Sequence, residues 1–453
     1  MSYARWCKEK EMKSFLKEVN ITKEVKTGGI PIINDGKTMY IPQRESHSLV
    51  IGGTGSGKTQ ATIFPLTKLA LLSEESVIIN DVKGDIYERT ASNFKEKGYN
   101  VIVINFDNPN LGSSWNPFTL PYQLYKNNEI DKASKLIDEL AYYLFADAEK
   151  KDYDPFWTNS VIDYFTGLSL YLFENATLEE INLNSVYTLG NELEDQKQGE
   201  KFLKELDKKS NIYYNLAGTL KSPIETKGGI VSTFNQKLKK YVGLKDLSNM
   251  LSITDFDLKE IANEKTAIYI VSGLNTQSSY LIPLFVSQVI NISNEYKTTD
   301  RVLNVVLDEF DTMIPIKNFA SLIKYSRSLG IRFTVVISSY LDLRNMYGPE
   351  SAEMIKACFP TIIYLISNDI YTLDEISKMC GNREVKEKIQ PLISIEELKV
   401  MKTFESIILI PRMMPFKTKL LPDYKINWNL ESKKLELPKR KITETKIYNL
   451  ELK

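Results

Sequence analysis

LVIGGTGSGKTQ, residues 49–60, joins a short apolar run to a glycine-rich turn that ends in a lysine and a threonine. The spacing from Gly52 to Thr59 is that of a phosphate-binding loop, G-x-x-x-x-G-K-[ST]. The apolar run before it is typical of a buried strand, and residues 59–72 carry helical spacing. Strand, loop and helix in this order predict an α/β fold.

Each position of this loop has a physical role in holding a nucleotide. Glycines let successive backbone N–H groups turn towards phosphate oxygens, and the helix that begins near Lys58 adds the positive end of its dipole. We expect Lys58 to reach the β- and γ-phosphates and Thr59 to ligate Mg²⁺. The motif thus predicts a site for ATP and Mg²⁺. Its nucleotide-binding residues are Gly52, Gly53, Thr54, Gly55, Ser56, Gly57, Lys58, Thr59 and Gln60.

A second motif is acidic. Asp308 and Glu309 are adjacent and directly follow the apolar run of residues 302–307. Ligands of open α/β sheets bind at the carboxyl ends of the strands, which is where this pair is expected. Asp308 is suited to the Mg²⁺ shell, and Glu309 to orienting and deprotonating a water molecule. Such a pair favours hydrolysis over kinase chemistry. The alternative is a solvated acidic turn, because Asp311 is nearby.

Two further groups are candidates for the same crevice. Asp81, Lys83 and Asp85 follow the apolar run of residues 76–80, although an ordinary polar loop explains them equally well. Arg327 and Arg332 precede a strand pattern that ends at Ser338 and Ser339. A cation near the γ-phosphate stabilises the transition state, but the spacing alone is more typical of surface arginines.

Strand patterns occur in two blocks that are separated by helical sequence. Apolar runs cover residues 76–81, 99–107, 266–273, 302–310, 333–339 and 361–367. Between them, apolar residues recur at three- and four-residue steps. We predict a discontinuous nucleotide-binding domain, an inserted all-α domain, and a C-terminal tail or docking strand. The predicted boundaries are 1–120 with 249–427, 121–248, and 428–453.

Composition excludes several classes of protein. The chain has 453 residues, 43% of them apolar, and zero formal net charge, so contacts with nucleic acid would come from local patches such as the lysines of residues 235–245. The single histidine, His47, excludes His-based zinc sites and argues against a Ser-His-Asp hydrolase. No apolar segment reaches the ~18–20 residues of a membrane span, so we expect a soluble chain.

The order of motifs resembles that of the type IV coupling proteins, the TraG/TraD-like ATPases of conjugation and type IV secretion. The matching pieces include HSLVIGGTGSGKTQATIFP, NDVKGDIYERT, SSWNPF, DPFWTNS, VVLDEFDTM and YSRSLGIRFTVVISSYLDLRNMYG. They run from residue 4 to about residue 420. The phosphate-binding loop is widespread, whereas the combination of NDVKGD, DPFW and YSR with LDLRNMYG is far more specific.

The resemblance implies a RecA-like nucleotide-binding domain with an inserted all-α domain, and ATP hydrolysis at the subunit interfaces of a homo-hexamer. It implies that Arg327 is an arginine finger acting beside Lys58 and Glu309 of a neighbouring subunit. It also implies recruitment of relaxase-bound DNA or secreted proteins to a type IV secretion channel, at the cytoplasmic face of the bacterial membrane. DNA is an expected partner.

Two departures from the family pattern bear on these expectations. Ser338 stands where the family usually has a glutamine thought to sense the γ-phosphate, which puts that role in doubt. Family members usually begin with transmembrane helices, and this chain starts about where their soluble part starts. Either the membrane segment is missing from this chain or a partner supplies the anchor. Without an anchor, we expect a monomer or weak oligomer.

Two other functions remain open from the sequence. The first is a DNA translocase of the FtsK or HerA type, which would move duplex DNA without a secretion channel. The large helical insertion and DPFW favour the coupling protein over it. The second is an ATP-gated substrate receptor with little turnover, which the departure at Ser338 keeps open.

Overall fold

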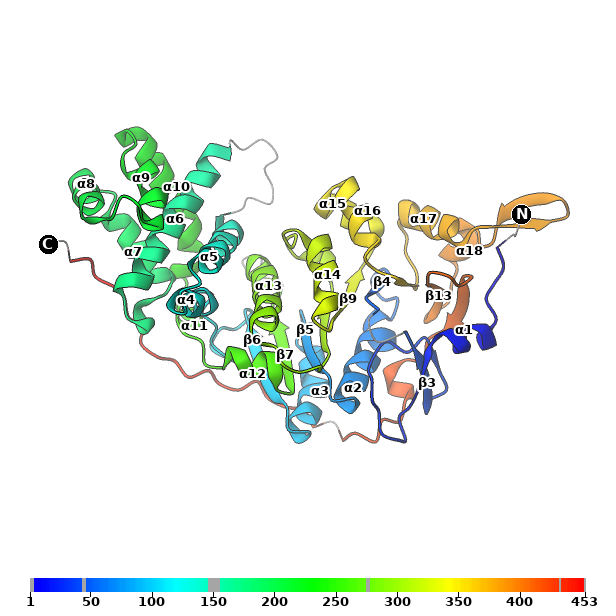
Figure 1. The fold of residues 1–453 in the computed structure, drawn as a ribbon. Helices are drawn as coiled ribbons and strands as arrows, with labels where there is room; N and C mark the ends of the chain where they lie inside the picture. Colours follow the sequence, from blue (N-terminus) through cyan, green and yellow to red (C-terminus); the bar gives the residue numbers. More distant parts are fainter. Residues whose placement is uncertain (1–3, 43–45, 146–154, 274–277, 432, 452–453) are drawn as a thin grey trace. The chain divides into compact units, whose positions relative to one another are not determined.

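The computed structural model describes residues 4–42, 46–145, 155–273, 278–431 and 433–451 (Figure 1). The chain forms two compact units. The first comprises residues 1–102, 259–273 and 293–436, and the second comprises residues 103–258, 274–292 and 437–453. Residues 121–248, the predicted insertion, lie within the second unit. Asp154 of the DPFW motif lies outside the described residues.

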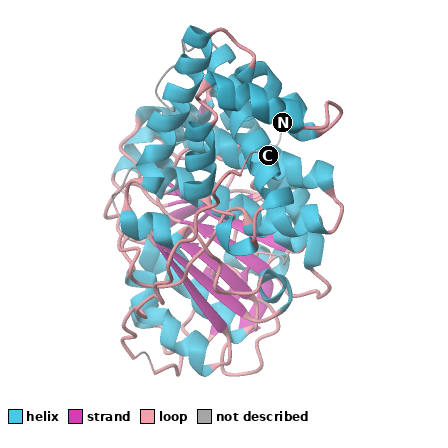
Figure 2. Ribbon diagram, turned by 90° about the vertical axis from the view of Figure 1, so that its left-hand side faces the viewer, coloured by secondary structure: helices cyan, strands magenta, loops and turns pink. Residues whose placement is uncertain are grey.

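A nine-stranded sheet with the order β14-β13-β10-β4-β9-β8-β5-β7-β6 organises the fold (Figure 2). Its strands are β4 (Ser48–Ile51), β5 (Ser76–Asn80), β6 (Asn100–Asn105), β7 (Thr266–Val271), β8 (Leu303–Leu307), β9 (Ile331–Ile337), β10 (Thr361–Tyr364), β13 (Glu405–Leu409) and β14 (Phe416–Lys419). β10, β4, β9, β8, β5 and β7 run parallel. Every residue of these six strands is buried, as continuous apolar runs predict.

Helices cover this sheet. α2 (Phe64–Leu72) contacts β5, and α3 (Asp85–Glu96) contacts β7. α14 (Phe319–Ser328) and α15 (Tyr340–Tyr347) contact β9. The other helices of the first unit are α1 (Glu9–Phe15), η1 (Thr59–Ile63), η3 (Phe310–Thr312), α16 (Pro349–Lys356), α17 (Ile370–Cys380), α18 (Ile395–Lys399) and η4 (Asp423–Lys425). The alternation of strands and helices confirms the predicted α/β class.

Two small sheets belong to the first unit and were not predicted from the sequence. β1 (Lys17–Asn20), β2 (Ile33–Asn34) and β3 (Thr38–Ile41) form one, in the order β1-β3-β2. β11 (Asn382–Val385) and β12 (Lys388–Pro391) form a separate hairpin. Their strands are two to four residues long, which is too short for an apolar period to be visible in the sequence.

The second unit is mainly helical. Its helices, together with two at its boundary, are α4 (Thr119–Lys126), α5 (Ile130–Phe145), α6 (Pro155–Asn175), η2 (Leu178–Glu180), α7 (Leu183–Glu192), α8 (Gln196–Glu205), α9 (Asn211–Leu220), α10 (Ile224–Val242), α11 (Lys245–Met250), α12 (Leu258–Asn263) and α13 (Ser278–Tyr296). α6 contacts α5, α7, α9 and α10, and α10 also contacts α5, α7 and α9, so these two helices together form the centre of the bundle. No helix of the described residues is long and apolar enough to cross a membrane.

The C-terminal segment is extended and docked rather than an isolated tail. Arg440 is buried, and its guanidinium donates to the carbonyl oxygen of Pro109 at 2.6 Å and to Asn249 Oδ1 at 2.8 Å. Asn182 Nδ2 donates to the carbonyl oxygen of Lys446 at 2.8 Å. The segment is thus held through its own Arg440 side chain and through its backbone at Lys446, which explains how a sequence with no apolar face can be docked.

A buried ionic cluster lies inside the first unit beneath β9. Arg332 is 5% exposed and donates to the carbonyl oxygen of Gly28 at 2.8 Å and to Asn304 Oδ1 at 3.0 Å. It also pairs with Glu75 at 3.3 Å, whose carboxylate accepts from the N–H of Gly28 at 2.9 Å. The cluster connects the amino-terminal ends of β5, β8 and β9 to the N-terminal segment at Gly28.

Removing one member of this cluster leaves a buried charge without its partner. We expect Arg332→Ala to lower the free energy of unfolding by about 3–5 kcal/mol, as measured by urea or thermal denaturation. Arg332→Met combined with Glu75→Gln removes both charges, so it recovers most of that loss. Exposed Arg327→Ala changes stability by less than about 1 kcal/mol. Equal effects of Arg332→Ala and Arg327→Ala would contradict the ionic cluster.

Candidate nucleotide-binding site

The phosphate-binding loop connects β4 to η1, and its backbone requires glycine at two positions. Gly55 and Gly57 have φ of +78° and +88°, which other residues rarely adopt. The N–H of Gly52 donates to the carbonyl oxygen of Ile337 at 3.0 Å, and that of Gly53 to Ile366 at 2.7 Å. The loop is therefore fixed to the ends of β9 and β10 before any ligand binds.

Lys58 lies inside the loop rather than in solvent. Its ammonium group donates to the carbonyl oxygen of Gly52. Burial lowers the pKa of Lys58, and the charges of Asp308, Asp311 and Glu309 oppose that change. Ser56 is buried, and its hydroxyl has no hydrogen-bond partner among the described residues. The loop thus has a cation and an unpaired hydroxyl where phosphate oxygens are expected.

Asp308 follows β8 and approaches the loop. Thr59 Oγ1 lies 3.4 Å from Asp308 Oδ2, and the N–H of Glu309 donates to Asp308 Oδ1 at 2.9 Å. Burial raises the pKa of Asp308 to about 6, and the Glu309 charge adds to the rise, whereas Lys58 lowers it. A hydroxyl and a carboxylate at this separation are the oxygen ligands that Mg²⁺ prefers, so these residues fit that ion.

Glu309 is held in an unusual backbone conformation. Its φ is +48°, in the left-handed region, and its carbonyl oxygen accepts a hydrogen bond from Thr312 Oγ1 at 2.7 Å. Non-glycine residues adopt this region at a cost of about 1–3 kcal/mol, and they are concentrated at functional sites. The Glu309 side chain is partly exposed.

The predicted accessory residues of the β5–α3 turn separate into two kinds. Asp81 is buried, and its Oδ2 accepts from the N–H of Tyr87 at 2.7 Å, so it caps the start of α3. Burial raises the pKa of Asp81 to about 6, and the charges of Asp85 and Asp308 contribute to the rise. Lys83 and Asp85 are exposed. Asp81 therefore lies electrostatically close to Asp308, with a structural role at the helix start.

Ser338 follows β9 at the same edge of the sheet. Its backbone N–H donates to Asp311 Oδ2 at 3.1 Å. Asp311, which the sequence offered only as a possible acidic turn, thus connects the end of β9 to the turn after β8. Ser338 remains partly exposed.

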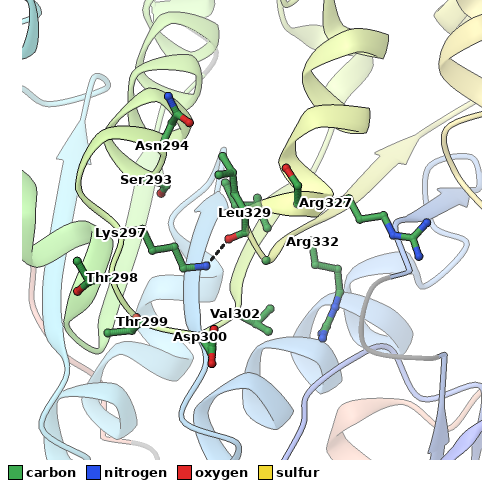
Figure 3. A pocket seen from close by; sticks show the side chains of 13 residues that line it. Ser293, Asn294, Lys297, Thr298, Thr299, Asp300, Val302, Arg327, Leu329 and Arg332 are labelled. Atoms are coloured by element: carbon green, nitrogen blue, oxygen red, sulfur yellow. Dashed lines mark hydrogen bonds between the residues drawn. The ribbon is translucent and has the colours of Figure 1, made fainter.

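Arg327 precedes β9 and Arg332 is its second residue, so both lie at the end of the strand opposite Ser338. Figure 3 shows their side chains. Both border a cavity of about 440 Å³ that is also lined by Lys297 and Asp300. Arg332 extends from β9 into the core, so the expectation that it is a surface residue is wrong. Arg327 is exposed at the C-terminal turn of α14. The side chain of Arg327 points away from that of Arg332 (Figure 3).

Sequence reasoning missed one residue that positions the acidic pair. Asn80 is buried at the end of β5, and its Nδ2 donates to the carbonyl oxygen of Asp308 at 2.8 Å. It fixes the turn that carries Asp308 and Glu309. The available signal was its position as the last residue of an apolar run, where a buried amide has to find a partner.

The raised pKa of Asp308 predicts that ionisation of this side chain lowers the stability of the folded protein as pH rises. The folded protein retains a proton between about pH 4 and pH 6 that the unfolded chain releases, so the group destabilises the fold as pH rises through this range. Asp308→Asn should therefore stabilise the nucleotide-free, Mg²⁺-free protein by about 1–3 kcal/mol at pH 7 and by almost nothing at pH 4.

The measurement is urea denaturation of both proteins from pH 4 to pH 8. Asp107→Asn, at an exposed position, is the control and should change stability by less than about 0.5 kcal/mol at each pH. A stabilisation by Asp308→Asn that is the same at pH 4 and pH 7 would exclude a titrating carboxylate as its source.

Comparison with known proteins places this geometry in a family. The family model for type IV secretory system conjugative DNA transfer matches residues 5–390. The plasmid coupling protein TrwB with the non-hydrolysable ATP analogue ADPNP is 14% identical with a TM-score of 0.69, covering 97% of this chain and 96% of that chain. TrwB with ADP and Mg²⁺ is 13% identical with a TM-score of 0.66, covering 97% and 96%.

A more distant likeness is to VirB4 of Thermoanaerobacter pseudethanolicus, at 12% identity and a TM-score of 0.50, covering 89% of this chain and 98% of that chain. A search among curated proteins gave no match. At these identities the solved structures establish the fold: a RecA-like α/β domain with an all-α region. The family match extends over most of the chain. The chain therefore belongs to the type IV secretory system conjugative DNA transfer family, the type IV coupling proteins.

Proposed function

We propose that this protein hydrolyses ATP to power the transfer of conjugative substrates, relaxase-bound DNA or secreted proteins, into a type IV secretion channel. One observation carries the proposal. Lys58, Thr59 and Asp308 converge at one edge of the parallel sheet, with Thr59 Oγ1 3.4 Å from Asp308 Oδ2. TrwB has been solved with ADPNP and with ADP and Mg²⁺, which supports a nucleotide and Mg²⁺ as the ligands here.

The residues divide the chemistry of hydrolysis among them. The loop from Gly52 to Gln60 binds the phosphates through its backbone N–H groups, and Lys58 neutralises charge on the β- and γ-phosphates. Thr59 and Asp308 would hold Mg²⁺, and the bound ion would neutralise further charge on the phosphates. Glu309 accepts a proton from the water that attacks the γ-phosphorus, while the bond from that phosphorus to the bridging oxygen breaks and ADP leaves.

Arg327 completes the site of a neighbouring subunit rather than its own. It lies before the first residue of β9, and Ser338 lies after the last. Seven strand residues span about 20 Å, which is longer than an arginine side chain. Since β4 and β9 are parallel, with Ile51 opposite Ile337, the chain's own loop is at the far edge. This separation supports action between subunits. For the assembly we propose a homo-hexamer at the cytoplasmic face of the membrane, as in the coupling-protein family.

Two substitutions separate binding from hydrolysis. Lys58→Ala should abolish turnover and weaken ATP binding, because the loop loses its only cation. Glu309→Gln should bind ATP as tightly as the wild type and lower the hydrolysis rate by about 10²–10⁴. Phosphate release and nucleotide binding are measured on the same samples. Wild-type turnover in Glu309→Gln would show that another group activates the water.

Mixing inactive variants tests whether Arg327 acts between subunits. Arg327→Ala and Lys58→Ala are each expected to be inactive. Together they should regain activity, because Lys58→Ala subunits supply Arg327 to the intact loops of Arg327→Ala subunits. The matched control mixes Lys58→Ala with Glu309→Gln, whose lesions both lie on the loop side of the site, so no activity returns. Full activity of Arg327→Ala alone would exclude the finger.

The ATPase and binding assays, together with a conjugative-transfer assay in cells, discriminate the two other functions. A receptor with little turnover binds ATP but hydrolyses it negligibly at every protein concentration and with added DNA. A translocase of the FtsK or HerA type is stimulated by duplex DNA and leaves conjugative transfer unaffected when Lys58 is replaced in cells. The proposed coupling protein requires Lys58 both for ATPase activity and for transfer.

A further inference from the structure

We infer that Phe404 and Tyr424 form an aromatic platform that binds the base of the nucleotide. This inference rests on the proposed nucleotide site, and it assigns the residues that contact the base. The two rings make an edge-to-face contact, with centroids 6.5 Å apart and an angle of 62° between their planes. Tyr424 is 66% exposed, which is a large exposed fraction for an aromatic side chain, and Phe404 is partly exposed.

The sheet brings both residues to the edge that carries the phosphate-binding loop. β13 is antiparallel to β10, so Phe404, just before β13, lies where β10 ends. β14 is antiparallel to β13, so the chain returns to that edge before Tyr424. The N–H of Leu420 donates to the carbonyl oxygen of Phe404 at 2.8 Å, which confirms that the two turns are adjacent.

Phe404 lies directly against the loop. A Cβ atom placed on Gly57 would be 2.4 Å from Phe404 Cε1, so only glycine allows the ring this close. Phe404 also has φ of +70°, in the left-handed region that bulky residues rarely adopt. The ring is therefore held beside the residues expected to bind phosphate.

Tyr424 is presented by a rigid turn. It lies in η4, which contacts η1, the first turn after the loop. Its neighbour Asp423 pairs with Lys68 at 2.8 Å and accepts from Trp428 Nε1 at 2.8 Å. Both side chains of the Asp423–Lys68 pair are about 11% exposed. A buried pair of this kind fixes the turn and leaves the Tyr424 ring in solvent without a structural role of its own.

The order of the strands indicates on which side of β4 the base of a bound nucleotide lies. β8, which carries Asp308 and Glu309, lies on one side of β4, and β10, β13 and β14 lie on the other. A triphosphate whose γ-phosphate meets Asp308 and Glu309 extends its base away from β8. Phe404 and Tyr424 are aromatic residues on that side, and every base presents a π-face to such rings.

Substitution of Tyr424 tests the platform. Stacking of a base on an aromatic ring is worth about 5- to 100-fold in affinity. We expect Tyr424→Ala to weaken Mg²⁺-ATP and Mg²⁺-GTP by such a factor, measured by titration calorimetry, while inorganic tripolyphosphate binds as it does to the wild type. Tyr424→Trp keeps an aromatic face, so it should bind ATP and change its fluorescence with ATP but not with tripolyphosphate.

Tyr214→Ala is the matched control, because Tyr214 is 65% exposed and belongs to the helical unit. It should leave all three affinities unchanged. If Tyr424→Ala binds ATP as tightly as the wild type, the platform is wrong and the ATPase proposal stands. If Tyr424→Ala weakens tripolyphosphate and ATP equally, the residue supports the loop and does not bind the base. If the wild type binds neither ATP nor tripolyphosphate, both proposals fail.

Discussion

The parallel pairing of β4, β9, β8 and β5 determines where every candidate catalytic group can lie. Leu49 lies opposite Val335, and Asn80 lies opposite Leu307, so these strands end at nearly the same level. Parallel strands bring their carboxyl ends to one edge, and the next residues of each chain segment meet there. A shift of register by one residue would turn each strand's side chains to the other face and separate these groups. The register is fixed by four fully buried strands rather than by the polar residues of the site.

The antiparallel strands at the other end of the sheet extend this edge. A purely parallel sheet would place only strand ends there, each separated from the next by a crossover helix. The β13–β14 hairpin instead begins and returns at the same edge within a few residues of Phe404. The chain can therefore place two aromatic rings close together on one side of the loop, while the carboxylates stay on the other. The carboxylates and the aromatic rings thus lie on opposite sides of the loop, at the same end of the sheet.

The sequence was sufficient for the strands of the large parallel sheet, because each is an apolar run longer than three residues. The loop and the acidic pair were recognisable because their spacing is local, and the roles of their residues in catalysis remain predictions. The sequence could not reveal that Arg332 is buried, since its partner Glu75 is 257 positions away. The same limit applies to Phe404 and Tyr424: neither is part of a motif, and their relation to Gly57 arises from a long-range strand pairing. Residues that depend on such pairings leave no local pattern.

The electrostatics of the site imply that ligand binding and stability are coupled. Asp308 and Asp81 both have pKa values raised to about 6, chiefly because burial disfavours their charged forms. The charge of Glu309 adds to the rise at Asp308, and the charge of Asp308 adds to the rise at Asp81. At neutral pH both carboxylates are therefore ionised although they are largely removed from water, which costs the folded state free energy. Lys58 lowers the pKa of Asp308 and so offsets part of this cost, but its ammonium is also the group that we propose to contact the phosphates. A divalent cation beside Asp308 would remove the repulsion, so the free energy that the empty fold loses here is returned on binding. This accounts for acidic residues being buried in a site that has to bind a polyanion.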